Sequence, residues 1–379
     1  MQKCLDSYSE HFTDFSPMLS YHEGQSRSTR WEQAAVNTLF VAPLDSNSSL
    51  LADMAQFAPG TSIAAVDDTS RNLGLAIKYR NEYYPLRNTA FKSLADRAKI
   101  GGTSLPKLEK PDLANILNKC LGLHSAAALL LIRDEKVSAA HSGDERDYSV
   151  LAIDELMKCI QDKLDGRFPG HRFDSGYTDH CITSASWSLP NQREELLGTY
   201  RKLLDAQGKS IMASKLMPGI RFCSSDTGSA SAKVAALLLG LSHPIHIGGM
   251  LSIEHRGKAT VSDFSASLDM IFAQFGDAIA MLENLTKVYL DYPVNAMTAV
   301  CKKLCLPKKA ALEAIEMFDI TIGDTRATAH DVFMGLQEII FTLKSEKTPE
   351  GKLLMVEENL SRALTLRWQD YDFARKVAY

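Results

Sequence analysis

The chain has 379 residues, of which 45% are hydrophobic and 23% are charged, with 22 Gly and 13 Pro. These are ordinary values for a globular protein, and they exclude a wholly disordered, collagen-like or disulfide-scaffold protein. The 42 Lys and Arg residues against 46 Asp and Glu residues give a formal net charge of −4, so a nucleic-acid site would have to be a local basic patch.

The first 60 residues are expected to form a loosely structured N-terminal extension, which ends in an Ala-Pro-Gly turn. Within it, the segment 31–41 fits either a short helix or a short strand. The segments 61–66 and 73–79 are apolar and are separated by Asp and Asn residues that favour turns. This pattern predicts two short strands.

From residue 88 the apolar residues recur three or four positions apart, which predicts a helix that ends at Gly101-Gly102 and a second helix after Pro111. The segment 126–141 predicts two strands joined by a turn at Asp134-Glu135. Because the first of these strands is apolar on both faces, we expect it to be central in its sheet. A further helix is predicted over 149–164.

The segment 167–190 is rich in turn formers and is expected to be irregular or β. After it, the patterns predict strands at 220–225 and 231–239, with a polar turn between them, and an apolar segment at 243–256 that contains a Gly-Gly bend. From residue 264 to the C-terminus the pattern is almost entirely helical.

These elements predict an α+β fold, in which a mixed or antiparallel sheet with flanking helices is followed by a helical C-terminal third. We expect three regions: an N-terminal extension at 1–60, an α+β body at 61–262 and a helical region at 263–379. The sequence shows neither a secretory signal nor an apolar stretch near the ~20 residues of a membrane helix. Its seven scattered cysteines are typical of a reducing compartment, so we expect a cytoplasmic protein with no membrane partner.

Templates for catalysis and for nucleotide binding are missing from the sequence. It contains no P-loop, no GxGxxG after a strand, no GxSxG and no HExxH. No catalytic residue and no cofactor are assigned, and the pattern does not favour an enzyme.

The best metal candidates are His243, His246 and His255. Pro244 and the following Gly-Gly pair argue against a helix at this place, and residues three apart on a strand face opposite sides. No metal site is therefore assigned.

Basic and hydroxyl residues cluster around two of the predicted strand ends. If these strands pair, cations and short donors come together, as binding of a phosphate backbone requires. A solvated polar turn explains the same pattern equally well. The candidate phosphate contacts are Arg221, Ser225, Thr227, His255, Arg256 and Lys258.

Aromatic and basic residues interleave at Lys78, Arg80 and Tyr83. Such a combination is typical of surfaces on which unpaired bases stack, although core packing is the alternative use of the aromatic residue. We therefore predict a second nucleic-acid contact surface here.

Several stretches, in this order along the chain, resemble a family of phage- and plasmid-borne proteins of unknown function, known as phage/plasmid-like proteins. The stretches are 88–105 (NTAFKSLADRAKIGGTSL), 112–121 (DLANILNKCL), 128–142, 148–156, 218–228 (PGIRFCSSDTG) and His255-Arg256-Gly257. The sequence departs from the family pattern at 142–148 and at 242–249. The resemblance implies no particular activity, but it implies an origin on mobile elements, where single-strand handling and counter-defence are common needs.

Together these features predict a protein that binds single-stranded DNA in phage or plasmid recombination or strand protection, without nucleotide hydrolysis. RNA in place of DNA stays open. A homo-oligomer is expected, because repeated weak sites along one strand multiply affinity. Two alternatives are a counter-defence factor that binds and inhibits a host protein complex, and a metal-dependent nucleic-acid enzyme built around the three histidines.

Overall fold

The computed structural model describes residues 2–45, 48–323 and 325–379. In these residues the named strands form antiparallel sheets, and helices dominate the chain from Val261 onward. The predicted α+β class with a helical C-terminal third is therefore confirmed, and the sheets are antiparallel rather than mixed. Across the same three ranges, no helix is both long and apolar enough to cross a bilayer.

The largest sheet has six strands in the order β1-β8-β9-β10-β11-β12, each antiparallel to its neighbours. These strands are β1 (Ser9–Phe12), β8 (Arg172–Asp179), β9 (Thr183–Ser188), β10 (Met217–Ser224), β11 (Ala232–Leu239) and β12 (Ile245–Ile253). The predicted strands at 220–225 and 231–239 are confirmed as β10 and β11. The Gly-Gly pair lies inside β12, and the segment 167–190 is mostly β.

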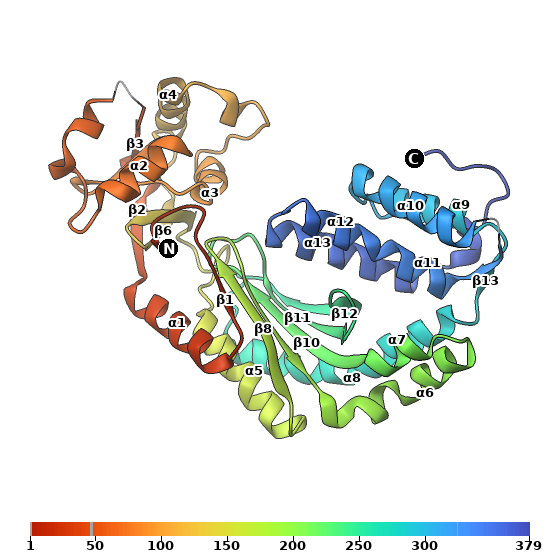
Figure 1. Cartoon of the computed structure of the whole chain (residues 1–379). Coiled ribbons are helices and arrows are strands. Elements are labelled where there is room, and N and C mark those ends of the chain that lie inside the picture. Colours follow the sequence, from red (N-terminus) through yellow and green to blue (C-terminus); the bar gives the residue numbers. More distant parts are fainter. Residues whose placement is uncertain (1, 46–47, 324) are drawn as a thin grey trace.

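One face of this sheet forms the main core, because side chains alternate between the two faces along each strand. Ile220 and Phe222 of β10 are fully buried on this face. Three helices cover it, and Figure 1 shows them beneath the sheet: α5 (Ile153–Arg167), α6 (Arg193–Ala206) and α8 (Val261–Leu285). The Phe264 ring of α8 contacts the Phe222 ring, with centroids 6.1 Å apart. The helix that starts at the expected boundary near 262 therefore shares its core with the sheet.

The opposite face of the sheet meets α13 (Glu350–Ser361), which contacts β12. Figure 1 shows the other C-terminal helices on this side of the sheet: α9 (Pro293–Lys303), α10 (Lys308–Ile322), α11 (Ala329–Leu336) and α12 (Glu338–Ser345). The sheet thus lies between two helical layers, and only its α8 side is uniformly apolar.

A second, smaller core lies beside β1 in Figure 1. It is built on two three-stranded sheets, β2-β6-β7 and β3-β4-β5. Their strands are β2 (Arg30–Ala35), β6 (Ala127–Arg133), β7 (Lys136–Ser142), β3 (Phe40–Pro43), β4 (Leu75–Tyr79) and β5 (Glu82–Pro85), and the packed helices are α3 (Ala90–Arg97) and α4 (Lys110–Leu121). The helix α2 (Ile63–Arg71) packs through Val66 against a separate small cluster on the other face of β4. The apolar strand β6 is central, as predicted.

The N-terminal residues differ from the expected loose extension. The strands β1, β2 and β3 all lie within the first 60 residues, and each joins a different sheet through partners far along the chain. The segment 31–41 contains β2, a 3₁₀ turn at 36–38 and the start of β3. The composition of the first 60 residues does not reveal these strands, because their partners lie about 32 to 170 residues away.

Two other predictions need correction. The predicted strand at 61–66 is wrong, since this segment enters the helix α2: the Ser62 side chain caps it by accepting from the Ala65 amide, and Val66 and Thr69 are buried one helical turn apart. The helix predicted at 149–164 begins only at Ile153, because the Ser149 amide donates to the His255 carbonyl.

Candidate functional site

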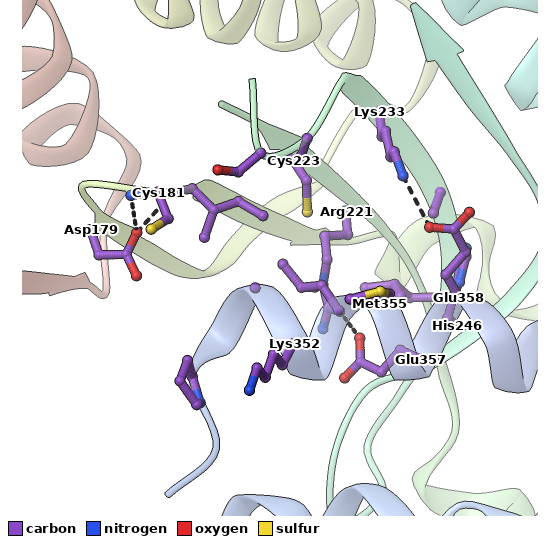
Figure 2. Close-up of a pocket in the computed structure, with 18 residues that line it drawn as sticks. Asp179, Cys181, Arg221, Cys223, Lys233, His246, Lys352, Met355, Glu357 and Glu358 are labelled. Atoms are coloured by element: carbon purple, nitrogen blue, oxygen red, sulfur yellow. Dashed lines mark hydrogen bonds and ion pairs between the residues drawn. The ribbon is translucent and has the colours of Figure 1, made fainter. Parts of the chain in front are cut away.

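A cavity of about 500 Å³ lies between the large sheet and α13. The sheet side chains that line it alternate with those of the main core: Arg221 and Cys223 from β10, Lys233, Ala235 and Leu237 from β11, and His246 from β12. Arg221 stands directly opposite Ala235, and Cys223 opposite Lys233. On the other side, α13 contributes Leu354, Met355, Glu357 and Glu358 (Figure 2).

Two ion pairs join the sheet to α13 across this cavity, as Figure 2 shows. The Arg221 guanidinium contacts the Glu357 carboxylate, and these side chains are only 11% and 5% exposed. The Lys233 Nζ lies 3.0 Å from the Glu358 Oε2. Arg221, predicted to contact phosphate, is therefore already neutralised by a buried carboxylate. A phosphate would have to displace Glu357 and leave it buried without a partner, which is costly.

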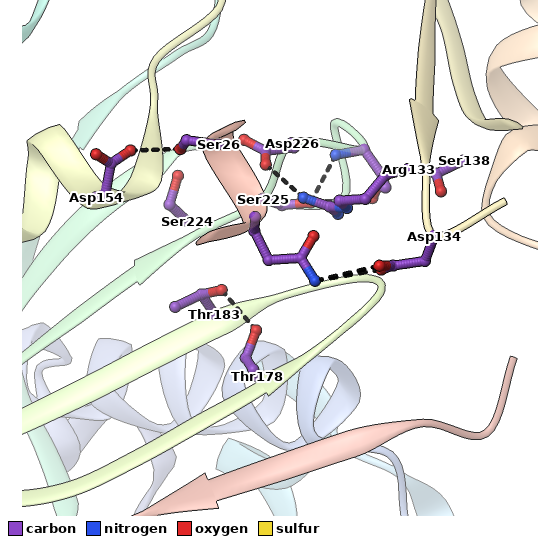
Figure 3. Close-up of polar contacts among 12 residues, drawn as sticks. Ser26, Arg133, Asp134, Ser138, Asp154, Thr178, Thr183, Ser224, Ser225 and Asp226 are labelled. Atoms are coloured by element: carbon purple, nitrogen blue, oxygen red, sulfur yellow. Dashed lines mark hydrogen bonds and ion pairs between the residues drawn. The ribbon is translucent and has the colours of Figure 1, made fainter. Parts of the chain in front are cut away.

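Ser225 and Thr227 lie in the turn between β10 and β11 and stabilise it through side-chain hydrogen bonds. The Ser225 Oγ donates to the Cys181 carbonyl and accepts from the Thr227 and Ser229 amides. Both side chains are buried. Arg133 pairs with Asp226 of the same turn at 2.8 Å, which Figure 3 shows. The hydroxyls predicted to contact phosphate thus face the protein and fix the turn.

His255 packs in a stack of rings behind this turn. Its ring is nearly parallel to that of Tyr148, which in turn stacks on His141 at 3.6 Å. The His141 Nε2 and the Tyr148 hydroxyl both lie 2.8 Å from the Asp226 carbonyl oxygen. Burial lowers the pKa of His255 below its ordinary value. A neutral, stacked histidine positions the turn and offers no charge to a phosphate.

Arg256 and Lys258 are the two candidates of this group that lie on the surface. The Arg256 guanidinium contacts Glu254, with side chains 67% and 55% exposed. Lys258 has a left-handed backbone, and its amide donates to the Glu145 carbonyl. The six residues predicted around the strand ends are therefore divided among a cavity, a buried turn and an exposed loop, and do not form one surface.

The second predicted group lies together on the β3–β4–β5 sheet. Lys78 of β4 is paired across the strands with Phe40 on one side and Tyr83 on the other. Its Nζ lies 5.6 Å from the centre of the Tyr83 ring. Phe40 is 49% exposed, whereas Lys78 and Tyr83 are half-buried. We call these three residues the aromatic row.

Arg80 lies at the turn next to the aromatic row. Its side chain is 73% exposed, lies over the Tyr79 ring at 4.9 Å and pairs with Glu32 at 3.4 Å. The sequence pattern predicts a contact surface at Lys78, Arg80 and Tyr83 and does not include Phe40. The only signal for Phe40 was its place in an apolar segment, and its pairing with Lys78 joins residues 38 positions apart.

Metal binding has no candidate cluster in the structure: over residues 2–45, 48–323 and 325–379, no group of three His, Cys, Asp or Glu side chains could hold an ion. His246 lines the cavity, and His255 contacts the Ser149 carbonyl. Cysteine chemistry is also disfavoured in the cavity, because burial raises the pKa of both Cys181 and Cys223 to about 11 and leaves the thiols protonated.

Comparison with family models, with curated proteins and with solved structures finds no match to this chain. The resemblance to phage/plasmid-like proteins therefore stays a prediction.

Proposed function

We propose that the protein binds single-stranded nucleic acid through the aromatic row of the β3–β4–β5 sheet. The observation that carries the proposal is the cross-strand order Phe40, Lys78, Tyr83, in which a cation stands between two aromatic rings. Neighbouring strands are about 4.8 Å apart, so the two rings lie roughly 10 Å apart and serve different bases of one strand.

The chemistry of the row fits an unpaired strand. An exposed ring offers a stacking face that any base accepts, at about 1–3 kcal/mol per base. Lys78 supplies a charge for the phosphate between two such bases. Arg80 is exposed at the neighbouring turn, but its guanidinium is paired with Glu32 and lies over the Tyr79 ring, so it contributes less. In a duplex the base faces are stacked on one another, so a duplex would make only the phosphate contacts with this surface. We therefore infer a preference for single strands, in the context of strand protection or recombination on a mobile element.

The first test is a fluorescence-anisotropy titration of a labelled oligothymidylate at 50 and 200 mM salt. Phe40→Ala removes a stacking face from a half-exposed ring, and we expect it to weaken binding by about 5- to 100-fold. Phe341→Ala is the matched control, because Phe341 is 57% exposed on α12, far along the chain from the aromatic row. Equal affinities of Phe40→Ala and the native chain would contradict the proposal, as would equal competition by duplex.

The salt dependence tests the phosphate contact separately. Each phosphate neutralised on a single strand contributes about 0.7 to the slope of log affinity against log salt. Lys78→Gln should therefore reduce this slope by about 0.7, whereas Lys202→Gln on the exposed face of α6 should not change it. A combined Arg256→Gln/Lys258→Gln variant reports on the two exposed cations of the first predicted group. A loss of binding there, with Lys78→Gln unchanged, would move the site away from the aromatic row.

A further inference from the structure

We propose that the cavity between the large sheet and α13 binds an amphipathic monoanion, that is, an apolar small molecule that ends in a single negatively charged group such as a carboxylate. This site is independent of the proposed nucleic-acid site, because no residue of the aromatic row lines the cavity. The size of the cavity, its apolar walls and one lysine without a partner at its mouth support the proposal.

The walls of the cavity suit the apolar part of such a ligand. Its volume of about 500 Å³ lies within the roughly 300–1,000 Å³ that small-molecule sites usually have. Apolar side chains line it from both the sheet and the helix: Ile182, Ala235, Leu237, Leu354 and Met355. Ala235 and Leu237 of β11 are buried, so an apolar chain that contacts them is removed from water, which favours binding.

Two of the cations around the cavity are already paired. Arg221 contacts Glu357, and Lys233 lies 3.0 Å from Glu358. A ligand anion that took either cation would leave a carboxylate without its partner, which is costly for a side chain as buried as that of Glu357. These pairs therefore close the cavity against α13 and do not receive the ligand.

The remaining acid of the lining, Asp179, is held by its own hairpin. One of its carboxylate oxygens accepts from the Cys181 and Ile182 amides at 2.6 and 2.8 Å, and the other accepts from the Tyr177 hydroxyl at 2.8 Å. Hydrogen bonds of this kind stabilise the charged carboxylate. Asp179 thus needs no cation from a ligand.

Lys352 is the charged side chain of the lining that has neither an ion pair nor a hydrogen bond within the part of the chain that the structure describes. It is exposed and lies one helical turn before Met355 on α13, as Figure 2 shows. Met355 is 57% exposed, so both side chains stand at the mouth of the cavity. The acid nearest in sequence, Glu350, does not line the cavity, and burial raises its pKa. A free cation at the mouth of an apolar cavity matches a ligand with one anionic end.

Decanoate, 1-decanol and decyltrimethylammonium are the probes for this site, because they have similar apolar chains and differ in charge. Each competes with N-phenyl-1-naphthylamine, an uncharged dye whose fluorescence rises in apolar surroundings, at low salt and below micelle-forming concentrations. We expect one dye to bind per chain, and decanoate to displace it at a concentration at least about 5-fold lower than decyltrimethylammonium does. Displacement by the cation at the same or a lower concentration, or the absence of saturable dye binding, would overturn the proposal.

A variant of Lys352 separates the charge contact from the apolar contact. Lys352→Glu reverses the charge at the mouth and should weaken decanoate by about 5-fold or more, while the affinity for 1-decanol changes by less than about 2-fold. Lys202→Glu makes the same change of charge on the exposed face of α6 and should leave both affinities unchanged. If Lys352→Glu changed the affinities for decanoate and 1-decanol equally, Lys352 would not hold the anionic end.

Two further variants locate the apolar part of the ligand. Met355→Gln places a polar group at the mouth and should weaken both decanoate and 1-decanol by about 3-fold or more, whereas Met270→Gln, at a residue 53% exposed on α8, should not. Ala235→Phe fills the cavity and should abolish binding in protein whose circular dichroism is native. Equal effects of the Met355 and Met270 variants would rule out this cavity. Phe40→Ala should leave decanoate binding intact, which separates this test from that of the nucleic-acid site.

Discussion

Lowering the pH from 7.5 to 5.5 should destabilise the folded chain by several kcal/mol, because buried histidines stay neutral in the fold. Burial is the main cause in every case and lowers their pKa values far below the usual 6.5. The affected residues are His22 (about 3), His141 (about 4), His180 (about 2), His243 (about 4), His246 (about 3) and His330 (about 4).

The direction follows from proton linkage. Between the unfolded pKa near 6.5 and the folded values of about 4 or less, the unfolded chain binds protons that the folded chain does not. The free energy of unfolding is therefore highest above pH 6.5 and falls as the pH falls. At pH 5.5 each such histidine lowers the free energy of unfolding by about 1.4 kcal/mol, so six independent histidines lower it by roughly 8 kcal/mol.

Carboxylates contribute little in this pH window. The hydrogen bonds of Asp68 and Asp331 lower their pKa values despite burial, so their contribution is lost only as the pH falls below about 4. Burial raises the pKa of Glu350, so the contribution of this carboxyl to the free energy of unfolding increases on acidification. It opposes the histidines but cannot cancel six of them.

Urea unfolding at pH 7.5, 6.5 and 5.5 measures this effect. The matched pair is His330→Gln, at a fully buried ring that contacts the Tyr200 hydroxyl at 2.6 Å, and His11→Gln at an exposed one. The native chain should lose free energy of unfolding between pH 7.5 and 5.5, and His330→Gln should reduce that loss by about 1.4 kcal/mol. This holds whatever the substitution does to stability at pH 7.5. His11→Gln should leave the loss unchanged. Equal stability of the native chain at pH 7.5 and 5.5 would contradict the burial of these rings.

The sequence predicts elements whose periodicity is local and misses those that depend on distant partners. The strand β6 is predicted to be central because it is apolar on both faces, and β10 is predicted from its alternation. The segment 61–66 is equally apolar, yet it enters a helix, because a serine cap and burial at 65, 66 and 69 outweigh the β pattern. A short apolar segment fits either a strand or a helix unless a possible helix cap is also considered.

At the candidate site, contacts between residues far apart in the sequence are again what the sequence does not predict. Arg221 has the right chemistry for a phosphate contact, but the residue that neutralises it, Glu357, is 136 positions away on α13. The composition of a segment does not reveal which charges meet after folding. Lys78 and Tyr83, in contrast, are joined by a short hairpin, so a local pattern of basic and aromatic residues predicts their proximity. Phe40 completes the row only through the β3–β4 pairing.

Replacing Lys136 with Met should destabilise the chain by about 3–5 kcal/mol, because it leaves the Asp68 carboxylate, whose side chain is only 13% exposed, without its cation. The Lys136 side chain is fully buried, and its Nζ lies 3.0 Å from Asp6 and 2.5 Å from Asp68. The buried Arg87 also contacts Asp6, at 3.2 Å. Two cations and two carboxylates thus join the N-terminus, α2 and β7.

A double variant separates the unpaired charge from lost packing. Lys136→Met/Asp68→Asn removes one charge of each sign and leaves Arg87 paired with Asp6, so it should recover most of the stability lost in Lys136→Met. Urea midpoints at pH 7.5 measure both variants, and Lys202→Met on exposed α6 is the control for the substitution itself. A double variant no more stable than Lys136→Met would mean that packing, not charge, is what Lys136 contributes. Recovery would mean that charge balance fixes the N-terminal segment, whose composition alone predicts a loose extension, against the sheet.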